Sequence, residues 1–240
     1  MVLSHNLTFI HGWGSSSVAW RHQVEHFSKK YSAKALDLPG HGNKPPIDLY
    51  TFNSLASSLS TIINPQAMNM LIGSSYGGML AIEMVHKEPK KFKALVLAGC
   101  NAKFSDGINP VIIKNLIRNL GRNFEATMRN CYGLFFSNKE GRAREAFLNE
   151  QALPDKKATI DILEQLITLD LNEKLKHMNI PTLIIHGDKD EVCPIGTGRL
   201  LHKDIKDSSF KVFKDAGHVP FYTQPQDFNR VLEDFIVNVK

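Results

Sequence analysis

Cysteine is scarce in this sequence, and so are the features that mark exported or membrane-embedded chains. The 240 residues include three cysteines, Cys100, Cys131 and Cys193, and no CxxC spacing. An odd, sparse set argues against a disulfide framework and favours a reducing compartment. No apolar run approaches the roughly 18–20 residues of a membrane helix. The opening MVLSHNLTFIHG lacks the basic segment and apolar core of a signal peptide. We therefore expect a cytoplasmic protein without membrane contact.

Net charge is small but unevenly spread. The formal net charge is +5, and residues 111–145 carry seven basic and three acidic side chains. No nucleic-acid-binding motif accompanies this basic segment, so nucleic acid is not an expected partner. Hydrophobic residues make up 42% and charged residues 22% of the chain. That composition is typical of a globular protein and leaves the fold class to be decided by pattern.

Six short apolar runs alternate with segments of helical spacing. The runs, each expected to be a strand, are residues 7–12, 33–40, 68–73, 93–99, 181–187 and 209–218. The helical segments are residues 18–27, 52–63, 76–86, 194–202 and 224–239. This alternation predicts an α/β fold with a mostly parallel sheet. Because the strands are almost continuously apolar, we expect helices on both faces of the sheet.

One interval breaks the alternation. Residues 101–179 contain helical patterns such as PVIIKNLIRNLG and ATIDILEQLITL, and no convincing strand. We interpret this segment as a helical lid, or cap, inserted before the penultimate strand and lying over the carboxyl edge of the sheet. The predicted organisation is one core, residues 1–100 and 180–240, with one insertion.

The stretch GSSYGG, residues 73–78, lies where a buried strand ends and a helix begins. It matches G-x-S-x-G with Ser75 at the centre, in the strand–turn–helix context that this motif requires. So sharp a turn needs small neighbours and projects the serine Oγ at the end of the strand. The N–H of Tyr76, at the helix N-terminus, is free to bind an oxyanion. Ser74 is expected to point away from the site. The alternative is a simple glycine- and serine-rich turn.

A serine hydroxyl needs a histidine to take its proton and a carboxylate to hold that histidine. His218 follows the last predicted strand in KDAGHVPF, and Asp188 and Asp190 follow the strand before it in LIIHGDKDEVCP. Both loops open at the same edge of the sheet as the serine. We predict the triad Ser75, Asp190 and His218. Asp188, expected to brace its loop, and the remoter Asp106 are the alternatives for the carboxylate.

A second oxyanion donor is expected after the first strand, in the HGWG of residues 11–14. We predict that the N–H of Trp13 supplies it and that the Trp13 ring lines the floor of the pocket. Such a donor typically stabilises the transition state by about 3–4 kcal/mol. The alternative is that Trp13 is only a core aromatic.

Taken together, HGWG, DLPGHG, GSSYGG, HGDKDEVCP and AGHVPF resemble the α/β-hydrolase superfamily, in family order from end to end. The resemblance implies the α/β-hydrolase fold and ester hydrolysis, and no metal or organic cofactor is implied. Within the superfamily, HGWGSSSVAW, IDILEQLITLDLNEKLKHMNIPTLIIHG and AGHVPFYTQPQDF are similar to the methyl ester esterases of biotin synthesis. The substrate of those enzymes is an acyl ester on an acyl-carrier protein. The likeness is weakest across residues 108–157, in the lid.

The resemblance also assigns roles within the lid. It implies that five consecutive residues line an acyl channel above the serine: Cys131, Tyr132, Gly133, Leu134 and Phe135. The alternative is that these side chains form the core of the lid.

A basic stripe lies on the first lid helix. The spacing of Lys114, Arg118 and Arg122 places them on one helix face. In the family a basic lid surface receives an acidic carrier protein, attracted by opposite charge. The alternative is a solvated helix face with no partner.

The expected activity is hydrolysis of a carboxylic ester, small or carrier-bound, by acyl transfer. Three other functions stay open. They are a short-chain carboxylesterase or thioesterase that needs no carrier, a C–C bond hydrolase or lyase of the same fold, and a ligand receptor. A serine nucleophile argues against dehalogenase or epoxide hydrolase chemistry, which needs an aspartate at that position.

Overall fold

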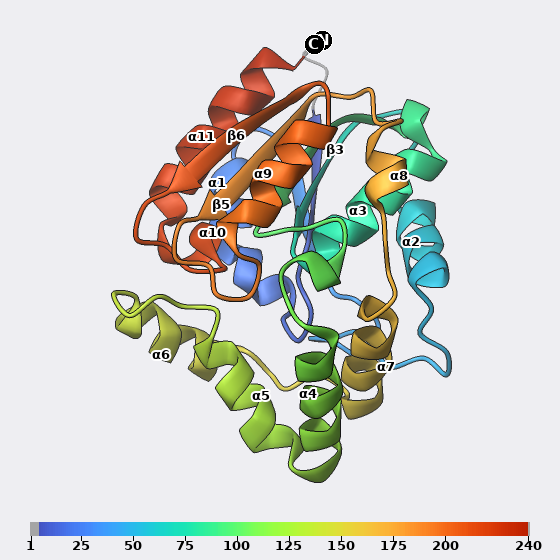
Figure 1. Ribbon diagram of the computed structural model, residues 1–240. Coiled ribbons are helices and arrows are strands. Elements are labelled where there is room, and N and C mark those ends of the chain that lie inside the picture. Colours follow the sequence, from blue (N-terminus) through green and yellow to red (C-terminus); the bar gives the residue numbers. More distant parts are fainter. Residues whose placement is uncertain (1–4, 240) are drawn as a thin grey trace.

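The computed structural model describes residues 5–239, and a six-stranded sheet lies at its centre (Figure 1). Its strands are β1 (His5–Ile10), β2 (Ser32–Leu36), β3 (Met68–Ser74), β4 (Phe92–Ala98), β5 (Thr182–Gly187) and β6 (Ser208–Phe213). All neighbours pair in parallel, in the spatial order β2-β1-β3-β4-β5-β6. The predicted α/β fold class with a parallel sheet is confirmed.

Helices cover both faces of this sheet. The helices that pack against it or against each other are α1 (Arg21–Phe27), α2 (Phe52–Thr61), α3 (Tyr76–Lys87), α8 (Asn172–Leu175), α9 (Ile195–Asp204), α10 (Pro220–Thr223) and α11 (Pro225–Asn238). Short 3-10 helices are η1 (Ser17–Trp20), η2 (Pro89–Lys91) and η3 (Phe104–Asp106). Helices α1, α10 and α11 lie on one face, and α2, α3, α8 and α9 lie on the other.

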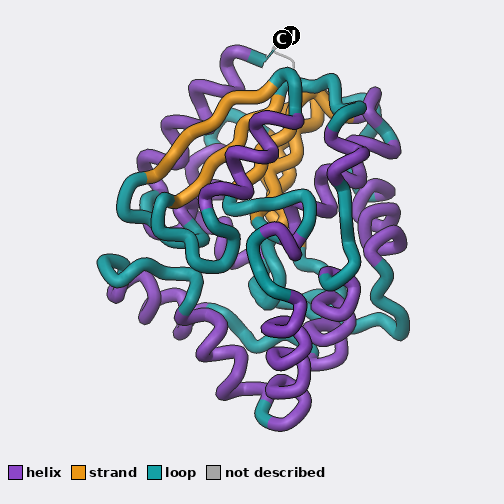
Figure 2. The backbone as a smooth tube through the Cα atoms, in the orientation of Figure 1, coloured by secondary structure: helices purple, strands orange, loops and turns teal. Residues whose placement is uncertain are grey.

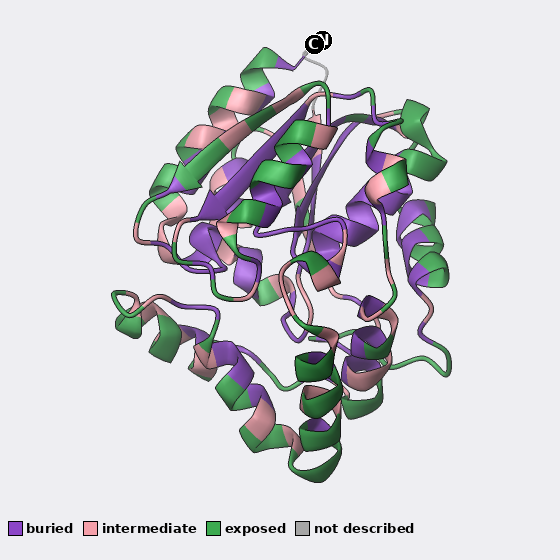
Figure 3. Ribbon diagram, viewed as in Figure 1, coloured by how far each residue is buried: buried purple, intermediate pink, exposed green. Residues whose placement is uncertain are grey.

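Burial follows each strand's position in the sheet (Figure 3). Every residue of β5 is buried, and β3 and β4 are buried along nearly all their length. The edge strands β2 and β6 instead include several exposed residues. Central strands with helices on both faces have no solvent side, which explains their continuous apolar sequence.

The segment between β4 and β5 contributes the helices α4 (Pro110–Arg122), α5 (Phe124–Gly133), α6 (Gly141–Glu150) and α7 (Lys156–Leu166). Figure 2 shows them gathered beyond the edge of the sheet at which β4 and β5 end. Asp155 caps α7 by accepting a hydrogen bond from the N–H of Ala158 (2.8 Å), and its own N–H donates to the carbonyl of Gly40 (2.7 Å). Within residues 5–239, no helix combines the length and apolar character needed to cross a membrane.

One predicted boundary is wrong in a way that matters for the site. The pattern predicts a strand over residues 209–218, but β6 ends at Phe213. Asp215 adopts a left-handed backbone with φ of 59°. That conformation cannot continue a strand, so the loop that carries His218 begins earlier than the pattern indicates.

Candidate active site

Ser75 lies in the turn between β3 and α3, with φ of 50° and ψ of −120°. A Cβ on Gly73 would lie 2.5 Å from the carbonyl O of Gly77, and a Cβ on Gly77 would lie 2.4 Å from that of His11. Only glycine therefore fits at these two positions, two residues before and two residues after the serine. A strained residue held this way by its surroundings is typical of functional sites.

His218 and Asp190 face each other, with the Nδ1 of the imidazole 2.8 Å from Oδ2 of the carboxylate. The other oxygen, Oδ1, accepts the N–H groups of Val192 (2.9 Å) and Cys193 (2.8 Å). Burial alone would raise the pKa of Asp190, but the facing His218 and His186 hold that pKa below its usual value. Asp190 therefore stays ionised although it is only 6% exposed.

The two alternative carboxylates are placed elsewhere. Asp188 has its nearest cation in Lys189, at 3.9 Å, and Asp106 ends η3. Among residues 5–239, Asp190 is the carboxylate that makes an ion pair or hydrogen bond with His218.

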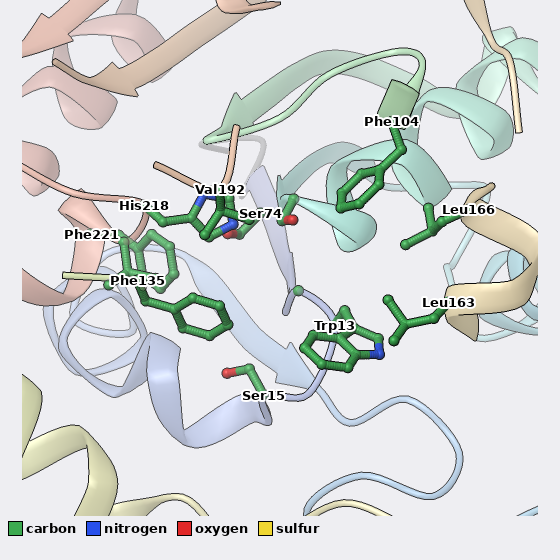
Figure 4. A pocket seen from close by; sticks show the side chains of 13 residues that line it. Trp13, Ser15, Ser74, Phe104, Phe135, Leu163, Leu166, Val192, His218 and Phe221 are labelled. Atoms are coloured by element: carbon green, nitrogen blue, oxygen red, sulfur yellow. The ribbon is translucent and has the colours of Figure 1, made fainter. Parts of the chain in front are cut away.

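Ser75 and His218 line one cavity at the carboxyl edge of the sheet (Figure 4). Its other walls are mostly apolar side chains from core and inserted segments: Trp13, Phe104, Phe135, Leu163, Leu166, Val192, Val219 and Phe221. Ser74 also lines the cavity, which corrects the expectation that it points away. In the described residues no hydrogen bond joins Ser75 Oγ to His218, a contact that in such sites often tightens only with substrate.

The two predicted oxyanion donors lie beside the serine. Tyr76 begins α3, and the Trp13 loop passes so close that a Cβ on Gly12 would lie 3.1 Å from the Cβ of Ser75. Neither backbone N–H, of Trp13 or of Tyr76, has an acceptor within residues 5–239. The Trp13 ring lines the cavity while its Nε1–H donates to the carbonyl of Thr159 (2.9 Å).

His11 holds the Trp13 loop in place. Its Nδ1–H donates to the carbonyl of Gly12 (2.8 Å), and its Nε2 accepts the N–H of Leu38 (3.0 Å). Burial, reinforced by the neighbouring His41, lowers the pKa of His11 to about 3. A neutral ring can donate and accept in this way, so His11 has a structural task in the HGWG motif.

A larger apolar hollow of about 330 Å³ adjoins the cavity. Three of the five predicted channel residues line it: Cys131, Leu134 and Phe135. Phe135 also lines the cavity at Ser75. Tyr132 and Gly133 line neither hollow, and the buried Tyr132 hydroxyl instead donates to the carbonyl of Gly14 (2.7 Å).

The predicted basic stripe lies on α4, where Lys114, Arg118 and Arg122 are all exposed. In the described part of the chain none of them makes an ion pair with an acidic side chain. Arg122 also borders a surface depression between α4 and α5, with Asn119 and Asn123 beside it. This depression shares Leu116, Cys131 and Leu134 with the apolar hollow.

Sequence reasoning missed one histidine of the site. His186 is fully buried at the end of β5, with Nε2 2.6 Å from the carbonyl O of Cys193 and 3.4 Å from Oδ2 of Asp190. Its position immediately before the Asp190 loop was the available signal. No group of three or more His, Cys, Asp or Glu side chains in residues 5–239 is arranged to hold a metal ion.

Comparison with known proteins places this geometry in context. The model of the alpha/beta hydrolase fold family matches residues 6–225. The pimeloyl-[acyl-carrier protein] methyl ester esterase of Wigglesworthia glossinidia brevipalpis is 28% identical, over 97% of this chain and 94% of its own. The corresponding esterase of Proteus mirabilis is 26% identical, over 95% of this chain and 90% of its own. Among solved structures, an esterase from Exiguobacterium antarcticum has a TM-score of 0.90 at 23% identity, over 99% of this chain and 94% of its own. This last likeness concerns the fold alone.

Proposed function

The chain belongs to the α/β-hydrolase family, and from that premise we propose that it is a serine carboxylesterase whose triad is Ser75, Asp190 and His218. One observation carries the proposal. His218, held by the buried Asp190 at 2.8 Å, lines the same cavity as the strained Ser75. Nucleophile, base and orienting carboxylate therefore meet where the two candidate oxyanion donors also lie.

The reaction follows from these positions. His218 takes the proton of Ser75 Oγ as the oxygen attacks the ester carbonyl, and the N–H groups of Trp13 and Tyr76 bind the resulting oxyanion. When the intermediate collapses, His218 gives that proton to the leaving alcohol and the acyl group stays on the serine. Water attacks the acyl-enzyme by the same route and releases the acid. Asp190 keeps the Nδ1–H of His218 pointing toward itself throughout.

The substrate we propose is the methyl ester of a pimeloyl group on acyl-carrier protein. The two curated relatives carry that activity in their names. The cavity at Ser75 shares lining residues with the apolar hollow, and the hollow shares others with the depression bordered by Arg122, so we propose that the three form one passage. An apolar chain fits such a passage with its ester at the serine, while an anionic carrier would meet the exposed cations of α4. In this role the inserted segment is a lid and the α4 stripe is a docking surface.

The triad is tested by replacing Ser75 with alanine. We expect hydrolysis of p-nitrophenyl butyrate to fall by about 10⁴-fold or more, because the nucleophile is lost. The far-ultraviolet circular dichroism should not change. If the folded variant still hydrolyses the ester, the proposed triad is wrong.

The substrate is tested by comparing kcat/KM for the carrier-bound pimeloyl methyl ester with that for p-nitrophenyl acetate and butyrate, with Ser75→Ala as the blank. A large preference for the carrier-bound ester supports the proposal. Comparable values for both kinds of ester would leave a carboxylesterase that needs no carrier. Activity on neither, with turnover of a diketone, would point to C–C bond hydrolysis.

A further inference from the structure

The loop that carries His218 is held from the core side by close backbone packing. A Cβ on Gly187 would lie 2.1 Å from the carbonyl O of Gly217, and a Cβ on Gly99 would lie 2.7 Å from that of His218. The N–H of Lys189 donates to the carbonyl of Ala216 (2.9 Å). The loop therefore cannot move toward the sheet without a clash, and another of its sides faces the inserted segment.

That side is fixed by a short stretch of the inserted segment, residues 135–140. The N–H of His218 donates to the carbonyl of Phe135 (2.8 Å). The Ser137 hydroxyl donates to the carbonyl of Asp215 (2.8 Å). Asp215 and His218, both in the histidine loop, are thus bonded to the same stretch of chain. That stretch belongs to neither the sheet nor the helices that cover it.

The Glu140 side chain bonds to both of these stretches at once, beside the ion pair of Lys139 with Asp215 (3.0 Å). Its Oε2 accepts the N–H of Ser137 (2.7 Å), within its own stretch, and the N–H of Gly217 (3.0 Å), in the residue before His218. Its Oε1 is buried and has no hydrogen-bond partner among the described residues. Burying part of a carboxylate is unfavourable, and the two charge-assisted bonds from backbone amides offset that cost.

The contact is also sterically tight. A Cβ on Gly217 would lie 2.5 Å from the carbonyl O of Phe135 and 2.9 Å from the N of Ser137. Backbone thus packs directly on backbone, with no side chain between to absorb a shift. If the bond from Glu140 is lost, Gly217 and the adjoining His218 are the residues that move.

We infer that Glu140 is a positioning residue for the catalytic histidine, contributed by the inserted segment. The inference rests on the proposed triad. Asp190 fixes the Nδ1 end of the His218 ring, and Glu140 fixes the backbone from which the ring projects. His218 must reach both Ser75 Oγ and the leaving alcohol, and a displacement of about 1 Å at such a site can lower the rate by about 100-fold.

The test uses Glu140→Ala and Glu140→Gln with p-nitrophenyl butyrate, which is too small to need the carrier surface. Alanine removes the acceptor, so we expect kcat to fall by about tenfold to a hundredfold with KM nearly unchanged. Glutamine keeps an oxygen for the same two N–H groups, and kcat should recover most of this loss. Glu145→Ala, which removes an exposed carboxylate from α6, is the matched control and should behave as wild type.

Two results would overturn the inference. One is a folded Glu140→Ala enzyme with wild-type kcat; the other is an equal loss of kcat in the alanine and glutamine variants. If Glu140→Ala does not fold, Gly217→Ala decides instead, because its added Cβ pushes the same contact apart from the loop side. Wild-type kcat in Gly217→Ala would then reject the inference. Failure of the triad itself is seen separately, as activity retained by Ser75→Ala.

Discussion

The inserted helices fall into two parts that differ in what they touch. α4 exposes Val111 and Ile112, 61% and 60% exposed, beside its three cations. The stretch from the end of α5 into α6 is instead packed and bonded to the core. Tyr132 donates to Gly14 in the Trp13 loop, and Glu140 accepts from the loop of His218. Figure 3 shows mostly exposed positions on α4. Its buried residues are Ile113 and Leu120, and those of α5 and α6 are Met128, Cys131, Tyr132 and Phe147.

The inserted segment therefore has two parts with different tasks. One part holds the loops that carry the proposed oxyanion donor and base, so its movement would disturb the chemistry. The other part, α4, lines the apolar hollow with Ile112 and Ile113, and in the proposed function it receives the substrate or its carrier. A substitution in the first part should change stability or kcat, whereas one in α4 should change only how large substrates bind.

The largest difference is expected in stability. Phe147 is fully buried and packs edge-on against Tyr132, Phe135, Phe136 and Tyr222. Phe147→Ala should lower the free energy of unfolding by about 3–5 kcal/mol, because it leaves a cavity among these rings. Ile112→Ala on α4 should change it by less than about 0.5 kcal/mol. Urea unfolding monitored by circular dichroism measures the free energy of unfolding of both variants. Similar losses in the two would contradict the division of the inserted segment into two parts.

Next in size is the effect of reversing the α4 charges. Replacing Lys114, Arg118 and Arg122 together with glutamate should lower kcat/KM for the carrier-bound ester by about tenfold or more, through slower association with an acidic partner. The value for p-nitrophenyl butyrate should not change, since the stripe lies outside the cavity at Ser75. The effect should shrink as salt is raised, because screening weakens attraction between exposed charges. An equal loss on both substrates would mean that α4 does not act as a docking surface.

Much of the core could be predicted from sequence, because each buried strand is a continuous apolar run ended by a residue that leaves the sheet. The pattern predicts a strand over residues 68–73, and β3 spans Met68–Ser74. The loops of the predicted triad could also be predicted, since parallel strands deliver their carboxyl ends to one edge. Asp190 and His218 are 28 residues apart in sequence, yet strand order alone brings them together.

The inserted segment could be predicted as helical, but its contacts with the loops of the core could not be predicted. Its periodicity shows which face of each helix is apolar and says nothing of which loop that face meets. Tyr132 reaches Gly14 across 118 residues of sequence, and Glu140 reaches Gly217 across 77. Both were open to other interpretations: Tyr132 as a channel residue and Glu140 as one charge in a basic segment. Only the folded structure shows whether such a residue lines the channel or holds a loop in place.

The smallest effect is expected from loss of the hydrogen bond between Tyr132 and the Trp13 loop. The buried hydroxyl of Tyr132 donates to the carbonyl of Gly14, next to the Trp13 amide that we propose as an oxyanion donor. Tyr132→Phe leaves that carbonyl without its partner while the ring packing remains, so stability should fall by about 1 kcal/mol. The Trp13 N–H shifts but is not lost, and kcat should therefore fall by only a few-fold, well short of the roughly 100-fold cost of deleting a donor.

The matched control is Tyr31→Phe, whose ring packs near Phe27 and His5, at the opposite end of β1 from the Trp13 loop. It should leave both quantities at wild-type values. Measured with p-nitrophenyl butyrate, an unchanged kcat in a destabilised Tyr132→Phe enzyme would mean that this bond holds the inserted segment without aligning the oxyanion site. The contacts between residues 135–140 and the His218 loop would then be the link between the packed part of that segment and the chemistry. A loss in both kcat and stability would show that this part aligns both catalytic loops.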